Sequence, residues 1–156
     1  MVSTELLRRY PFFGELSSSH LKAIALISNE ISYEKGAVLF EEGESADYFY
    51  LLMDGEIDLY YRSEKENNKG GRKELLAAVI DSGEIFAVSA LIEPYIYTAT
   101  ARVAKPCTTL KIEAGELRNL MGKKCELGYI LMRQIAKSVM ERLEYTRVQL
   151  AAAWAE

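Results

Sequence analysis

The sequence predicts a mainly β domain with flanking helices, either a sandwich or a roll, that ends in one long helix. Short runs of alternating or apolar residues, separated by turn residues, recur from residue 31 to residue 112. Both ends of the chain instead carry apolar residues at helical spacing. A chain of 156 residues with 49% hydrophobic residues is long enough for one domain with a substantial core.

The first thirty residues are expected to be helical. Residues 17–19 are serines that can cap a helix, and apolar residues follow them at helical spacing: Leu21, Ile24, Ala25 and Ile27. A short apolar run at residues 38–40, bounded by Gly36 and Gly43, then predicts a strand.

Residues 48–61 are predicted to form two strands joined at Asp54-Gly55, the strongest hairpin signal in the chain. Residues 63–72 are polar, with charges of both signs, and are expected to form a mobile hairpin tip. Further strands are expected at three places, followed by a short helix at residues 113–121 that Gly122 ends. The three strands are residues 74–80, 98–103 and 108–112.

The last predicted element is a helix over residues 126–153, which contain no proline and would span about 42 Å at ~1.5 Å per residue. One apolar face lies near its start: Leu127, Ile130, Leu131 and Ile135. A second set repeats at alternating spacings of four and three residues: Met132, Ala136, Val139, Leu143, Thr146, Leu150 and Ala153. We call this second set the seam. Its spacing is typical of a coiled coil and favours pairing with a second copy over packing on the chain's own sheet.

Composition excludes several classes of function. A formal net charge of -4 argues against general nucleic-acid binding, which needs a basic face. No apolar run is long enough to cross a bilayer, and the N-terminus lacks the apolar core of a signal peptide. Cys107 and Cys125 are the only cysteines and suit a reducing cytoplasm, while a single histidine, His20, argues against a metal site. No catalytic arrangement stands at an informative spacing, so we expect no enzyme.

The most informative segment is residues 83–103. A glycine turn leads into a short apolar stretch, residues 86–92, which is predicted to be helical and which Pro94 ends. Small residues at the start of such a stretch leave backbone N–H groups open to an anion. Yet no Arg or Lys lies between Gly83 and Ala101, whereas an anion in a dry pocket favours a charged donor. The segment therefore has the outline of a ligand site without its charges.

Residues 33–56, with Pro11-Phe12-Phe13 upstream and Gly83-Glu84-Ile85-Phe86 downstream, resemble the cyclic nucleotide-binding domain family. This family includes the sensor domains of transcription factors of the catabolite-activator and fumarate/nitrate-regulator types. The resemblance covers essentially the whole chain, with Gly36, Gly43 and Gly55 in the expected order. It implies a β-roll, a double-stranded β-helix of jelly-roll type, with flanking helices and a long dimerising helix.

The resemblance also places the family's phosphate-binding cassette, and the match is incomplete. Phe86 matches, but Ala87 stands where the family has Gly, and Val88 where it has Glu. Tyr97 stands where the family has the Arg that pairs with the cyclic phosphate, although Thr98 and Ala99 match the small residues after it. The candidate ligand-binding residues are therefore Gly83, Glu84, Phe86, Ala87, Val88, Ser89, Ala90, Leu91, Tyr97, Thr98, Ala99 and Thr146. We expect the ring of Tyr97 to fill part of the nucleotide space.

Other bases could replace the missing Arg only at some distance. Arg102 is an odd number of residues from Tyr97, so on one strand it should face the other way. Lys105 shares the parity of Tyr97 but lies about 26 Å along an extended chain. It stays open whether a base from residues 63–72 or from a second subunit takes the place of this Arg.

Thr146 matches the helix position at which some family members present a hydroxyl to the purine. It is either a ligand contact across a dimer or a threonine bonded to its own helix, and we favour the second.

These observations predict a regulatory or signalling domain with weak or lost cyclic-nucleotide binding, acting as a dimeric sensor or interaction module in the cytoplasm. The alternatives are a genuine cAMP- or cGMP-binding domain and a sensor of another small ligand. We expect no cofactor beyond such a ligand, no metal, no membrane contact and, without a helix-turn-helix before Glu156, no direct nucleic-acid binding. Residues 1–125, from the first helices to the short helix, and residues 126–156, the long helix, are expected to form one domain.

Overall fold

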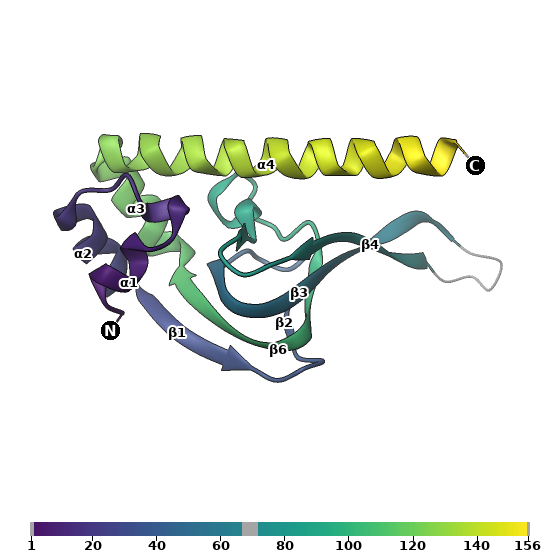
Figure 1. Ribbon diagram of the computed structural model, residues 1–156, viewed down its shortest axis with the longest axis horizontal. Coiled ribbons are helices and arrows are strands. Elements are labelled where there is room, and N and C mark those ends of the chain that lie inside the picture. Colours follow the sequence, from purple (N-terminus) through teal and green to yellow (C-terminus); the bar gives the residue numbers. More distant parts are fainter. Residues whose placement is uncertain (1, 67–71, 156) are drawn as a thin grey trace.

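The computed structural model describes residues 2–66 and 72–155 (Figure 1). Three short helical elements come first, as predicted: α1 (Thr4–Arg8), the 3-10 helix η1 (Pro11–Phe13) and α2 (Ser18–Leu26). Ser17, the first residue of the serine run, caps α2 because its hydroxyl accepts a hydrogen bond from the backbone N–H of His20 at 3.2 Å.

Six strands form one antiparallel sheet that curls into a roll, so the predicted mainly β fold class is confirmed. The strands are β1 (Ser28–Tyr33), β2 (Val38–Phe40), β3 (Tyr48–Glu66), β4 (Arg72–Ile80), β5 (Ile85–Phe86) and β6 (Thr100–Glu113). Their order is β1-β6-β3-β4, with β2 paired to β6 and β5 paired to β3. Figure 1 shows the roll on one side of the molecule and the helix α4 (Cys125–Trp154) laid along its upper face.

The predicted hairpin at Asp54-Gly55 is wrong, because β3 runs through these residues without turning back. Residues on both sides of Gly55 pair with β6, and the register shifts between Leu52 and Ile57. Gly55 has a φ of 101°, so it forms a bulge that bends the strand instead of reversing it. A hairpin would need the two halves of β3 to pair with each other, whereas the 14-residue strand β6 pairs with both. β6 pairs with both halves of β3 as one unbroken strand, so it replaces the two strands expected at residues 98–103 and 108–112.

β3 and β4 pair in antiparallel fashion on either side of the expected hairpin tip, of which residues 67–71 lie outside the described part of the chain. The helix expected over residues 86–92 is only a single 3-10 turn, η2 (Val88–Leu91). The short helix predicted after β6 is α3 (Ala114–Lys123), and it continues one residue past Gly122.

Helix α4 is docked at its start and exposed at its end. Leu127, Leu131 and Ile135 are buried, as predicted, and Ile130 is half-buried. Gly128 allows the close approach of α3, since a Cβ there would lie 2.7 Å from the carbonyl oxygen of Met121. Beyond Ile135 the seam residues are exposed on α4.

The bulge glycine gives a first test of the fold. Gly55→Ala should lower the free energy of unfolding by more than Gly36→Ala, measured by urea denaturation. Both glycines have a φ near 90–100°, which costs a residue with a side chain about 1–2 kcal/mol. Only at Gly55 would the new Cβ also meet backbone, 2.5 Å from the carbonyl oxygen of Pro106, whereas nothing lies within 4 Å of it at Gly36. Equal losses from the two variants would contradict the close packing of β3 on β6.

Candidate functional site

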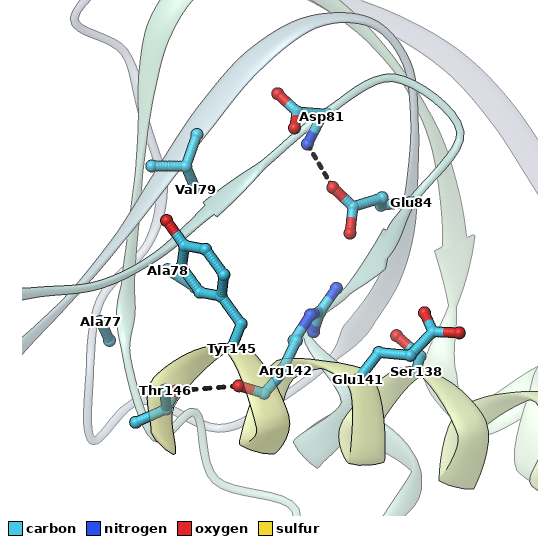
Figure 2. Close-up of a pocket in the computed structure, with 10 residues that line it drawn as sticks. All are labelled: Ala77, Ala78, Val79, Asp81, Glu84, Ser138, Glu141, Arg142, Tyr145 and Thr146. Atoms are coloured by element: carbon cyan, nitrogen blue, oxygen red, sulfur yellow. Dashed lines mark hydrogen bonds between the residues drawn. The ribbon is translucent and has the colours of Figure 1, made fainter. Parts of the chain in front are cut away.

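A cavity of about 290 Å³ lies between helix α4, strand β4 and the turn that connects β4 to β5 (Figure 2). Strand β4 supplies a wall of small and apolar side chains, the turn supplies two carboxylates, and α4 supplies polar groups and one aromatic ring. The lining residues are Ala77, Ala78, Val79, Asp81, Glu84, Ser138, Glu141, Arg142, Tyr145 and Thr146. The volume is close to the lower end of typical small-molecule sites.

Arg142 is the one cationic residue of this lining, and it reaches from α4 toward the turn that carries Glu84 (Figure 2). Its Nη2 donates a hydrogen bond to the carbonyl oxygen of Ile85. Its Nε is enclosed and has no hydrogen-bond partner among the residues that the structure describes. Burial lowers the pKa of the Arg142 guanidinium, and the nearby charges of Glu84 and Glu141 partly oppose that shift. The site thus holds a desolvated cation.

The turn before β5 explains why Arg142 finds an acceptor there. Gly83 donates to the carbonyl oxygen of Leu52 at 2.7 Å, and Leu52 donates to that of Glu84 at 2.9 Å, so the turn is tied to β3. The Glu84 carboxylate accepts a hydrogen bond from the backbone N–H of Asp81 at 2.8 Å. The next residue, Ile85, accepts a hydrogen bond at its carbonyl oxygen from Arg142 of α4. Arg142 therefore couples the helix to the roll.

Thr146 lines the same cavity but also bonds to its own helix. Its Oγ1 donates to the carbonyl oxygen of Arg142 at 2.9 Å, which is the interpretation that the sequence favoured (Figure 2). Tyr145 beside it brings an aromatic ring to the cavity and is 59% exposed. A contact between Thr146 and a ligand stays a prediction.

The cassette itself is packed into the core. Ala87 has a φ of 65° and a ψ of 39°, the left-handed conformation for which Gly is best suited. Phe86, Ala87, Ala90 and Leu91 are buried. The carbonyl oxygen of Ala90 accepts a hydrogen bond from Arg118 Nη1 at 2.6 Å. None of these cassette residues lines the cavity described above.

Tyr97 is buried where the roll closes, with only 4% of its surface exposed. That its ring fills part of the nucleotide space stays a prediction. Its hydroxyl donates to the carbonyl oxygen of Tyr48 at 2.9 Å and accepts from the Tyr48 backbone N–H at 3.1 Å. Its ring stacks on Phe40 with the centroids 3.8 Å apart, and Phe40 in turn stacks on Tyr50 and Phe86. Burial raises the pKa of Tyr97 to about 12, so the phenol stays neutral and can donate.

The other candidate bases do not replace the missing Arg. Arg102 forms an ion pair with Glu74 at 3.0 Å and lies over the ring of Tyr60. Lys105 is exposed, and neither Arg102 nor Lys105 lines the cavity. A base from residues 63–72 lies outside the side chains that the structure describes.

The cavity therefore contains only two of the candidate ligand-binding residues, Glu84 and Thr146. The sequence did not single out the wall of β4 or the remaining groups of α4, because small alanines carry no chemical signal. Arg142 could have been identified from Thr146, since residues four apart share a face of a helix.

The described part of the chain contains no group of three His, Cys, Asp or Glu residues placed to hold a metal ion. Within the same residues, no helix combines the length and the apolar character that a membrane crossing requires.

Comparison with known proteins agrees with this fold. Residues 30–124 match the family model described as "Cyclic nucleotide-binding domain". A solved structure from Geobacter metallireducens GS-15, provisionally assigned as a cyclic nucleotide-binding protein, is 39% identical with a TM-score of 0.80. The match covers 92% of this chain and 99% of that one. The sensor domain of the transcriptional regulator DNR from Pseudomonas aeruginosa shares the fold, at 23% identity and a TM-score of 0.68, over 90% and 91% of the two chains.

A CRP-like cAMP-activated global transcriptional regulator from Mycobacterium tuberculosis is 23% identical over 147 residues. That match covers 94% of this chain but 61% of the regulator, so the chain spans about three fifths of that relative's length. The family model covers well over half of the chain, and the order of glycines, strands and long helix agrees with it. The chain belongs to the cyclic nucleotide-binding domain family.

Proposed function

We propose that this chain is a non-enzymatic regulatory domain that acts as a dimeric sensor or interaction module and binds cyclic nucleotides weakly or not at all. The observation that carries the proposal is Tyr97, whose hydroxyl is occupied on both sides by the backbone of Tyr48. A side chain held in this way has no donor left for a phosphate. Val88 likewise offers no carboxylate for a ribose hydroxyl.

The expected loss of affinity is large. In the family, the cassette Glu and Arg are charged partners of the bound nucleotide, and this chain has neither at the matching positions. Removing one partner of a buried charge pair costs about 3–5 kcal/mol. At about 1.4 kcal/mol for each factor of ten, this corresponds to roughly a hundred- to several-thousand-fold in affinity.

A sensor of another small ligand is the second candidate, and the cavity between α4 and the roll favours it. The cavity contains a desolvated cation, hydroxyl groups from Ser138 and Thr146, and the ring of Tyr145. Five of its lining residues come from the helix α4, and one of them, Arg142, is bonded to β5. A ligand that competes for Arg142 would alter how α4 is held against the roll, and the helix would carry the signal.

The exposed surface of α4 supports a dimer. From Val139 onward the helix presents apolar side chains to solvent, with Val139 44%, Leu143 49% and Leu150 56% exposed. Met140 and Val148, beside the seam, are exposed as well, so the apolar surface is wider than the seam alone. Contiguous exposed apolar surface marks interaction sites, and a regular seam on a helix fits a second copy of the same helix.

The ligand proposal can be tested by titrating the domain with cAMP and cGMP in a calorimeter. We expect dissociation constants above the micromolar range, because neither cassette charge is present. The double substitution Val88→Glu and Tyr97→Arg should raise the affinity for cAMP, provided that urea denaturation shows a folded domain. The matched control, Val88→Gln with Tyr97→Met, restores length without charge and should not. Submicromolar binding of cAMP by the unmodified domain would contradict the proposal.

The dimer proposal can be tested by sedimentation. Leu143→Glu places two like charges in the seam of a parallel pair, so their desolvation and repulsion should dissociate the dimer at micromolar concentration. Gln149→Glu adds the same charge outside the seam and should leave the dimer intact. The roll should stay folded in both variants, because Leu127, Leu131 and Ile135 dock the helix independently. A wild-type monomer at high concentration would refute the dimer.

A further inference from the structure

We propose that Arg142 is the anion receptor of the cavity between α4 and the roll, and that the ligand of this site carries a single negative charge. This inference rests on the sensor function proposed above and names the ligand chemistry of the same site. It moves the recognition of charge from the cassette to the long helix.

The hydrogen bonding of Arg142 is incomplete. A guanidinium presents five N–H donors in a fixed fork. Nη2 is used to hold the helix to the carbonyl of Ile85, while the enclosed Nε has no acceptor within residues 2–66 and 72–155. An enclosed N–H without a partner is unfavourable, so the site gains most from a ligand that supplies an acceptor there.

The guanidinium of Arg142 also lacks a direct ion pair within the described part of the chain. Among the residues that the structure describes, the ion pairs are Arg102 with Glu74 and Arg133 with Glu15, so Arg142 has no carboxylate in direct contact. Desolvation is nevertheless the largest effect on its pKa, which it lowers. A desolvated cation that no carboxylate contacts directly favours an anion that bonds to it.

The carboxylates around the cavity limit the charge of that anion. Three carboxylates, Asp81, Glu84 and Glu141, line the same cavity as Arg142. Glu84 and Glu141 are close enough to affect the Arg142 pKa, so they would repel a doubly charged ligand more strongly than a singly charged one. A singly charged group, whether a phosphodiester or a carboxylate, therefore fits better than a phosphomonoester.

An anchor role alone does not account for this arrangement. Holding α4 to β5 needs one donor at the Ile85 carbonyl, which Nη2 provides. It does not require Nε to be enclosed beside a cavity with Tyr145 and small alanines on its walls. The two roles make different predictions, because an anchor does not respond to ligand charge.

The test follows the Nε–Hε signal of Arg142 in proton–nitrogen spectra of the full chain, assigned by its absence in Arg142→Lys. The probes are cAMP and benzoate, which are singly charged, AMP, which is mostly doubly charged at pH 7, and uncharged adenosine. We expect at least one singly charged probe to shift the signal saturably. That probe identifies the source of the charge as phosphodiester or carboxylate. Adenosine should leave the signal in place, and AMP should bind more weakly than cAMP.

Matched variants separate binding from anchoring. Arg142→Gln should weaken the binding of the responding probe about ten- to a hundredfold, and Arg142→Lys by less, because Lys keeps the charge. Arg147→Gln, on the exposed face of the same helix, should change it less than twofold. The urea midpoints of the variants show whether the helix remains docked. If Arg142→Gln unfolds, the loss of affinity is measured on Arg142→Lys instead.

The inference is overturned if neither cAMP nor benzoate shifts the signal, if adenosine shifts it equally, or if AMP binds more tightly than cAMP. These outcomes differ from failure of the proposed function. Submicromolar cAMP binding through Arg142 would support the anion receptor and contradict weak nucleotide binding. If no probe shifts the Arg142 signal, the anion receptor is contradicted and weak nucleotide binding stands.

Discussion

The hydroxyl of Tyr97 holds the closing segment of the roll against the start of β3, by bonding to both backbone groups of Tyr48. The same side chain continues inward as a stacked aromatic column with Phe40, Tyr50 and Phe86. A buried phenol can satisfy one donor and one acceptor at once, which an arginine at this position cannot do because it has no acceptor. At the Tyr97 position, the cassette is therefore stabilised by neutral hydrogen bonds and by apolar packing.

This packing changes which residues can bind a charged group of a ligand. With Phe86, Ala87, Ala90 and Leu91 buried, the cassette contributes to the core instead of to the cavity wall. The cation that faces the cavity comes from the helix, where Arg142 bonds to the edge of β5. Because α4 also carries the exposed apolar seam, one helix connects the proposed ligand site to the proposed dimer interface. Ligand occupancy and assembly would then be linked through Arg142 and Leu143, which are adjacent in sequence.

The sequence predicted those elements in which local patterns and tertiary packing agree. The serine cap of α2, the β character of the middle segment and the buried start of α4 all follow from spacing and composition. The Asp54-Gly55 hairpin failed because Gly55 serves a bulge, and a bulge is decided by the partner strand, which local sequence does not contain. The helix expected over residues 86–92 shortened to one turn, because the buried core residues Phe86 and Ala87 fix its start.

Site prediction had a different limit. The resemblance predicted the cassette positions and the two missing charges, and the structure shows Tyr97 buried. It did not locate the cavity, because that requires the helix and β4 to be placed against each other. Ala77 and Ala78 matter only through the space that they leave, and Arg142 only through the bonds that it lacks.

We infer that a ligand binds between α4 and β4, and not at the cassette. Mapping backbone amide shifts of the domain during titration with cAMP tests this directly, because even millimolar binding moves the signals of neighbouring residues. The account predicts that the largest shifts cluster at residues 77–84 and 138–146. Shifts concentrated at residues 86–91 and 97–99, with α4 unaffected, would contradict it.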